Sequence, residues 1–422
     1  MEIQAGKKRL RPSALVSLGF ALGGLGLLLS WTLPQQSPAG EIESFLESHW
    51  RKPIPPQGEA PAGYSPLEAS LRPEDCGTCH VEQYRAWRTS RHSRGMGPGV
   101  LGQVLEMEGR DPGTAELCQS CHAPRSEQLR KLRSPAGSGV FVNNTGFDED
   151  LQAGGLICAA CHVRKHRRFG PPPRGGPPES AKPAQASLPH GGFTSQETFS
   201  RSEFCKDCHQ FREDGFALNG KLLENTYAEW LESSYARSGV TCQGCHMPDR
   251  RHLWQGIHSP EMVRQGIDVS LTSGKSRYRP GELLEATLQI ANRGTGHFFP
   301  TYVTPKVIVR FWLEERAGKR IAGSLVEKSI GREVELDLSR EIYDTRIPPG
   351  GRWKWTYRKR IESGGLQLRT QVVVYPDHFY TRFFEAVLPQ YTKPRERKLI
   401  QAALEETRRS RFVVFDRRIP VT

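Results

Sequence analysis

Residues 242–254 read CQGCHMPDRRHLW, in which two cysteines are separated by two residues and a histidine follows the second cysteine directly. One such stretch is compatible with a zinc knuckle, a redox dithiol or a haem attachment site, because C-x-x-C takes its meaning from its context. The same arrangement occurs as CGTCH from residue 76, CQSCH from 118, CAACH from 158 and CKDCH from 205. Together the five copies use all 10 cysteines of the 422-residue chain.

The repeated histidine distinguishes between these chemistries. Two thiols on one helical turn can form thioethers to the two vinyl groups of a haem, and the next residue then presents its imidazole to the iron. Structural zinc needs four ligands from paired knuckles, and five knuckles do not pair. Disulfides would leave the five histidines unexplained. The pattern therefore predicts five covalently attached haem c groups.

The predicted thioether cysteines are Cys76, Cys79, Cys118, Cys121, Cys158, Cys161, Cys205, Cys208, Cys242 and Cys245. The predicted proximal iron ligands are His80, His122, His162, His209 and His246.

The N-terminal residues predict export. The basic segment KKRLR at residues 7–11 precedes an apolar run at residues 13–33. This arrangement is typical of a signal peptide, and the run is also long enough to span a bilayer. Cleavage after Ala39 and retention as an anchor both fit, and the length favours retention. We expect a periplasmic protein, tethered to the inner membrane if residues 1–35 are retained.

The formal net charge of +13 could indicate a nucleic-acid or lipid partner. Haem propionates change this interpretation, since five haems would offset roughly 5 to 10 positive charges. The sequence has no nucleic-acid-binding motif, so we expect no nucleic-acid partner. Much of the Lys and Arg excess is assigned to propionate pairing and solvated surface.

The sequence predicts a multidomain fold. Residues 36–72 are rich in proline and are predicted to form a tether. Residues 73–265 carry the five motifs with little hydrophobic periodicity, which predicts a mostly helical and irregular domain organised by its haems. Residues 266–390 contain short β-branched and aromatic runs separated by turns, which predict an all-β, immunoglobulin-like sandwich. Residues 391–422 are predicted to be a helical tail.

The sixth ligand of each iron separates a carrier from a catalyst. His92 is the strongest candidate, because Tyr84, Arg88 and His92 are four residues apart and share one face of a helix. A similar stretch from residue 227 has Tyr235 where the first has His92, and we interpret Tyr235 as structural. His49, His166 and His378 rank below the others. The predicted distal ligands are His92, His190, His252, His258 and His297.

Two stretches resemble a known family. Residues 76–92, CGTCHVEQYRAWRTSRH, resemble the haem module of multihaem cytochromes of the cytochrome c-554/c-552 type. The stretch from FCKDCHQF to CQGCHMPDRRHLW resembles exported multihaem cytochromes with a C-terminal β domain and a G-H-x-x-P-T loop, here Gly296, His297, Pro300 and Thr301. The resemblance covers about residues 73–300. It implies closely packed, mostly bis-histidine haems and supports the five motifs and His92, whereas Tyr235 departs from the family pattern.

Three functions follow as hypotheses. The favoured one is a non-enzymatic carrier that moves electrons from a membrane, quinol-linked donor to a periplasmic or extracellular acceptor. The second is an oxidoreductase that acts on a small nitrogen or sulfur compound at one open haem. Against it, the lysine-terminated motif frequent in multihaem nitrite reductases does not occur. The third is a structural haem subunit of a filament or respiratory complex. All three require the cytochrome c maturation machinery, and the first requires redox protein partners.

Overall fold

The computed structural model describes residues 38–135, 137, 139–174 and 188–421. The predicted signal or anchor segment, residues 1–35, lies outside the described residues. Within the described part of the chain, no helix is both long enough and apolar enough to cross a membrane. The chain divides into two units, residues 1–43 and residues 44–422, and apart from the first residues of α1 the features discussed below belong to the second unit.

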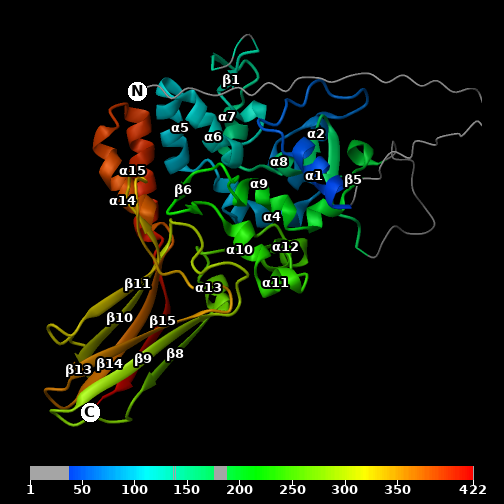
Figure 1. Ribbon diagram of the computed structural model, residues 1–422. Helices are drawn as coiled ribbons and strands as arrows, with labels where there is room; N and C mark the ends of the chain where they lie inside the picture. The colour runs from blue at the N-terminus through cyan, green and yellow to red at the C-terminus, as the bar shows by residue number, and fades with distance from the viewer. Residues whose placement is uncertain (1–37, 136, 138, 175–187, 422) are drawn as a thin grey trace, which may run out of the picture. The chain divides into compact units, whose positions relative to one another are not determined.

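Short helices joined by loops make up the region that carries the five motifs (Figure 1). Four of the motif helices end at their histidine, and His80 directly precedes α4. The helices of this region are α1 (Pro38–His49), α2 (Pro66–Ala69), α3 (Pro73–Gly77), α4 (Val81–Thr89), α5 (Pro98–Arg110), α6 (Pro112–His122), α7 (Glu149–Ala153), α8 (Cys158–His162), α9 (Glu203–His209), α10 (Thr226–Leu231), α11 (Ser234–Arg237), α12 (Cys242–His246) and α13 (Pro260–Gly266). Its short strands are β1 (Lys131–Arg133), β2 (Phe141–Asn143), β3 (Val163–Arg164), β4 (Arg167–Gly170), β5 (Thr194–Ser195), β6 (Ala217–Leu218) and β7 (Lys221–Leu222).

The apolar clusters of the motif region are small. One surrounds Trp87 and Ile157, and another surrounds Met96 and Val104. Clusters of this size cannot by themselves offset the conformational entropy lost by a segment of this length. The protein part of this region therefore leaves much of its interior to be supplied by the attached groups, as the sparse hydrophobic pattern predicts.

The segment predicted as a tether differs from that prediction. Leu46, Trp50 and Ile54 are buried, and Ile54 forms a β-bridge with Arg125 near the second motif. The Ile54 carbonyl also accepts a hydrogen bond of 2.9 Å from the Ser126 amide. Leu46 lies on α1, and Trp50 follows its last residue and donates from its amide to the Leu46 carbonyl at 2.8 Å, so the end of α1 carries apolar side chains that pack. The prediction of a tether missed this short amphipathic helix because residues 36–72 are rich in proline.

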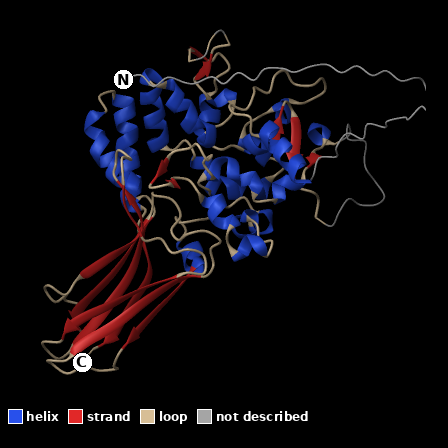
Figure 2. Cartoon of the chain, viewed as in Figure 1, coloured by secondary structure: helices blue, strands red, loops and turns tan. Residues whose placement is uncertain are grey.

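Two antiparallel sheets form the C-terminal part of the chain, residues 267–420, which we call the β half (Figure 2). The first has the strand order β13-β9-β8 and the second has the order β12-β11-β10-β14-β15. Buried residues alternate along β9 and β10 and belong to one apolar cluster, so the two sheets enclose a common core. An immunoglobulin-like arrangement remains a prediction. The strands are β8 (Ile267–Ser273), β9 (Leu283–Asn292), β10 (Lys306–Glu315), β11 (Val326–Val334), β12 (Glu341–Asp344), β13 (Arg352–Arg360), β14 (Leu366–Tyr375) and β15 (Phe412–Pro420).

The predicted helical tail is only partly helical. Helices α14 (His378–Val387) and α15 (Pro394–Arg409) form an insertion between two paired strands, and the chain then returns as β15 beside β14. The sequence FVVF at residues 412–415 is rich in strand-forming residues, which explains the return to a strand. Figure 1 shows α15 beside α5 of the motif region, so the insertion fastens the β half to the motif region.

Candidate haem and iron-ligand sites

Hydrogen bonds orient four of the five motif histidines. His122, His162 and His246 each donate from Nδ1 to a backbone carbonyl, at 2.7, 2.8 and 2.6 Å respectively. His209 instead donates from Nδ1 to the hydroxyl of Tyr302, at 3.0 Å. An imidazole that carries its proton on Nδ1 has a lone pair on Nε2, which is the form that binds iron. These rings are therefore held ready for axial ligation.

Three motif histidines face a second imidazole. Two imidazoles on opposite sides of one metal ion, each about 2 Å from it, have ring centres roughly 6 to 6.5 Å apart. The separations and interplanar angles are 6.0 Å and 39° for His162 with His252, 6.3 Å and 41° for His209 with His92, and 6.4 Å and 14° for His246 with His297. All three pairs fit a bis-histidine iron.

The three facing histidines were predicted from the sequence, and each is in a form suited to a ligand. His252 and His297 donate from Nδ1 to the carbonyls of Arg250 and Phe298, at 3.0 and 2.9 Å. His92 is packed 4.5 Å from the Trp254 ring. Burial, together with neighbouring histidines, lowers the pKa of His92 to about 3 and so keeps its imidazole neutral. Neutral imidazole is the donor that iron requires.

His190 and His258, the other two predicted distal ligands, differ in which ring nitrogen is hydrogen-bonded. His190 donates from Nδ1 to the Gly192 carbonyl at 2.9 Å, which leaves its Nε2 for a metal. It lies near His80, whose pKa is lowered by burial and then by His190. His258 instead places Nε2 2.9 Å from a carboxylate oxygen of Asp377. The structure thus brings His258 to a carboxylate and not to an attachment histidine.

Three histidines that the sequence made weaker candidates for iron ligands place Nε2 next to a backbone carbonyl or a carboxylate. His49 donates from Nε2 to the Cys161 carbonyl at 2.8 Å, and His166 donates from Nε2 to the Gly58 carbonyl at 3.2 Å. The Nε2 atom of His378 lies 3.5 Å from the carboxylate of Glu333. Tyr235 donates its hydroxyl to the Arg293 carbonyl, in keeping with a structural role.

Cysteines of different motifs are neighbours. The side chain of Cys76 in the first motif neighbours that of Cys158 in the third, and the side chain of Cys205 in the fourth neighbours that of Cys242 in the fifth. The second and fourth motifs meet in the same way through two further cysteines, Cys121 and Cys208. The fourth motif therefore contacts two others and lies at a junction of the array.

Lys52 occupies the contact between the second and fourth motifs. Its Nζ lies 3.9 Å from the sulfur of Cys121 and 3.4 Å from the sulfur of Cys208. It also forms an ion pair of 2.6 Å with Asp207. The Asp207 carboxylate offsets the charge of Lys52, so this place holds a buried ion pair between the two motifs.

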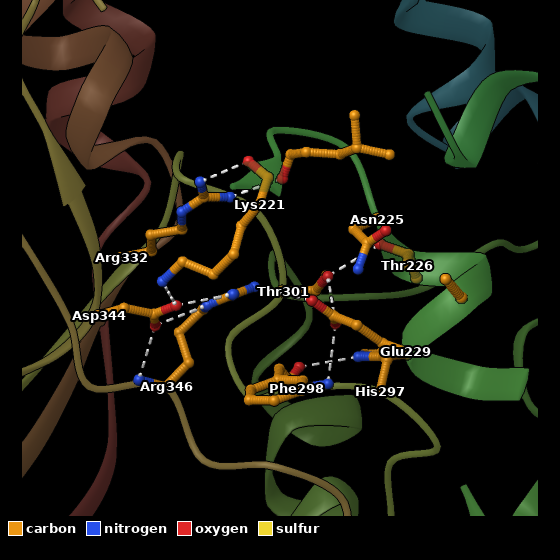
Figure 3. Close-up of polar contacts among 12 residues, drawn as sticks. Lys221, Asn225, Thr226, Glu229, His297, Phe298, Thr301, Arg332, Asp344 and Arg346 are labelled. Atoms are coloured by element: carbon orange, nitrogen blue, oxygen red, sulfur yellow. Dashed lines mark hydrogen bonds and ion pairs between the residues drawn. The ribbon is translucent and has the colours of Figure 1, made fainter. Parts of the chain in front are cut away.

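The loop that carries His297 is fastened by Glu229 of α10 (Figure 3). One Glu229 oxygen accepts hydrogen bonds from the Phe298 amide at 3.0 Å and the Thr301 hydroxyl at 3.3 Å. The other oxygen pairs with Arg346 at 2.9 Å, and the two side chains are only 4% and 5% exposed. Sequence reasoning did not identify Glu229, because a single glutamate in a helix carries no pattern that marks a buried partner.

The same network extends into the β half. Arg346 also pairs with Asp344 at 2.9 Å, and Asp344 accepts a 2.7 Å contact from Lys221 of the motif region. Nearby, the buried Arg332 pairs with Glu341 at 2.8 Å and donates to backbone carbonyls of residues 218, 221 and 222. The contact between the motif region and the sheets is therefore built from buried charges that are paired.

A family model and several solved structures are similar to parts of this chain. Residues 75–140 match the family model described as cytochrome c554 and c-prime. The penta-haem cytochrome c552 from Thermochromatium tepidum is similar with a TM-score of 0.57 and 18% identity, covering 85% of this chain and 100% of that chain. A β-glucosidase from Listeria innocua has a TM-score of only 0.15 and 10% identity, over 26% of this chain and 15% of that one. No curated protein matches the sequence.

Proposed function

We propose that this chain is a multihaem c-type cytochrome of the cytochrome c554 type and that it carries electrons through five covalently bound haems. The donor in this proposal is a membrane, quinol-linked component, and the acceptor is periplasmic or extracellular. The observation that supports a carrier is the set of three imidazole pairs spaced for one iron each. An iron with two histidine ligands has no free position for a substrate.

The proposal assigns a distal histidine to four of the motifs. His92 serves the fourth motif, His252 the third and His297 the fifth, as the ring separations support. His190 is assigned to the first motif because of its position near His80. His258 has no motif in this assignment, because its Nε2 is bound to Asp377.

One observation favours a second function. Among the described residues, neither His80 nor His122 has an imidazole at the ring separation of the three pairs, but His190 lies near His80, whereas the histidines near His122, His92 and His209, are paired with each other. An iron at the second motif with an open position could reduce or oxidise a small nitrogen or sulfur compound. This is the oxidoreductase hypothesis, confined to one iron.

Two measurements on the purified oxidised protein test these functions. Mass spectrometry of the mature polypeptide should show the added mass of five haems, and the absence of added mass would reject both functions. Electron paramagnetic resonance should then count low-spin and high-spin irons. Five low-spin irons would support the carrier alone, whereas one high-spin iron that binds nitrite or hydroxylamine would support the oxidoreductase.

Export and assembly complete the proposal. Covalent haem attachment requires the cytochrome c maturation machinery, and we place the mature protein outside the cytoplasm for this reason. The segment that would decide between cleavage and a membrane anchor lies outside the described residues. Cell fractionation with and without residues 1–35 replaced by a cleavable signal would separate the two.

A further inference from the structure

One loop of the β half reaches two motif histidines. His297 faces His246 of the fifth motif, and Tyr302, five residues later, accepts a hydrogen bond of 3.0 Å from Nδ1 of His209 in the fourth motif. The two contacts are made by residues of one connection between β9 and β10. The environment of two neighbouring haems thus depends on the same few residues.

The group that accepts the Nδ1 hydrogen bond of His209 differs from the acceptors at the other motif histidines. His122, His162 and His246 donate from Nδ1 to backbone carbonyls, but His209 donates to a side-chain hydroxyl. The Tyr302 hydroxyl is also hydrogen-bonded to Thr226, and the Thr226 hydroxyl donates to a Glu224 oxygen at 3.1 Å. An imidazole that binds iron through Nε2 carries its hydrogen on Nδ1, so the Tyr302 oxygen accepts from His209 and the Tyr302 hydrogen is left for Thr226.

The backbone holds Tyr302 in place. Its φ is +63°, in the left-handed region that a bulky side chain rarely adopts. Such a conformation persists where the surroundings enforce it. Here Glu229 holds the preceding residues Phe298 and Thr301, and Thr301 lies 2.8 Å from the Thr226 hydroxyl. The position of the Tyr302 side chain is therefore fixed by the contacts of Glu229 with the preceding residues and by the hydrogen bond to Thr226.

We propose that Tyr302 is a positioning residue that sets the reduction potential of the haem at the fourth motif through its hydrogen bond to His209. The inference rests on the proposed function, which makes His209 an iron ligand. An acceptor at Nδ1 makes the imidazole a stronger donor and stabilises the ferric state. Because the fourth motif adjoins the second and the fifth, a change at this haem alters how electrons distribute over the array.

The test is Tyr302→Phe in the full haem-loaded protein, followed by a spectroelectrochemical titration. Removal of the hydroxyl should raise the midpoint potential of one haem and leave the other four unchanged, with the number of low-spin irons unaltered. Tyr357→Phe is the matched control, because Tyr357 donates its hydroxyl to the Ser324 carbonyl inside the β core, at 3.2 Å. This control should shift no potential.

Other results would overturn the inference. Unchanged potentials, a fall, or an equal shift of all five haems in the Tyr302 variant would each exclude a specific effect on His209. If that variant does not fold, Thr226→Val removes the partner of the phenol and should give a smaller shift in the same direction, with no shift overturning the inference. Lack of haem on Cys205 and Cys208 in the unmodified protein would instead reject the proposed function.

Discussion

A histidine that binds iron through Nε2 keeps only Nδ1 for the protein. This rule separates the histidines of the molecule: His252, His297 and His190 donate from Nδ1, whereas His49 and His166 donate from Nε2. The sequence places a histidine in each stretch but contains nothing that reports which nitrogen it uses. The distinction depends on carbonyl groups supplied by the folded backbone.

His92 gives the first prediction at the residue scale. Substitution of His92 by Ala removes the imidazole that faces His209 at 6.3 Å and should convert one low-spin iron per molecule to high spin. Electron paramagnetic resonance of the oxidised protein measures the change. His166→Ala serves as the control, because His166 uses Nε2 for the Gly58 carbonyl and should leave the spectrum unaltered. An unchanged spectrum for the His92 variant would remove it from the ligands.

Glu229 gives a prediction of stability. Glu229→Ala leaves the buried Arg346 with Asp344 as its one acidic partner among the described residues and should lower the free energy of unfolding by about 3 kcal/mol, since removing one member of a buried ion pair exposes the desolvation cost of the other. Chemical denaturation of the haem-loaded protein measures it. The exposed pair of Glu285 with Arg358 is the comparison, and Glu285→Ala should cost no more than about 1 kcal/mol. Equal effects of the two substitutions would contradict the argument.

At the scale of elements, the inserted helices α14 and α15 pack against α5 of the motif region at two glycines of α5. A Cβ atom at Gly99 would lie 2.6 Å from a ring carbon of Phe384, and one at Gly102 would lie 2.9 Å from the end of Ile400. Phe384 and Ile400 are buried, so neither can move away easily. The glycines of α5 are therefore required by packing and not by a turn.

Gly99→Ala should consequently destabilise the protein by about 1 to 3 kcal/mol through overpacking against Phe384. Denaturant unfolding is the measurement. Gly109→Ala in the same helix is the control, because only the Lys393 Nζ lies within reach, at 4.0 Å. That change should stabilise by about 0.5 to 1 kcal/mol, because alanine is the better helix former. A gain of stability at both positions would disprove the close packing.

The elements show why part of the fold could be predicted and part could not. The five motifs were identifiable because haem attachment is a local chemistry of five consecutive residues, and β9 and β10 because their burial alternates. Helix α1 and strand β15 were not, because α1 is short and proline-rich at its borders, and β15 pairs with β14 across a long insertion. Glu229 and Tyr302 act through contacts more than 60 residues away in the sequence, which leave no local pattern.

At the scale of the whole molecule, the two halves have unequal apolar interiors. The β half has one extensive core, whereas the motif region has small clusters. If haems fill the interior of the motif region, their contacts with the folded chain stabilise that region against unfolding. A chain made in the cytoplasm, without the maturation machinery, should be cleaved readily within residues 44–260.

Limited proteolysis with mass spectrometry checks this expectation. The haem-free chain should leave a resistant fragment that contains residues 267–375, while the haem-loaded protein should resist cleavage in both halves. Circular dichroism of the haem-free chain should retain the signal of strands and lose much of the signal of helices. Protection of residues 44–260 without haem would show that the protein core there is sufficient by itself.

Strand β15 ends at Pro420 and completes the sheet that begins with β10, while its preceding helices clasp α5. During synthesis the chain emerges from its N-terminus, so all five thiol pairs are available while strand β15 is still missing. The order of assembly follows: cofactors can be joined to the motif cysteines before α14 and α15 have packed against α5 and before β15 has paired with β14.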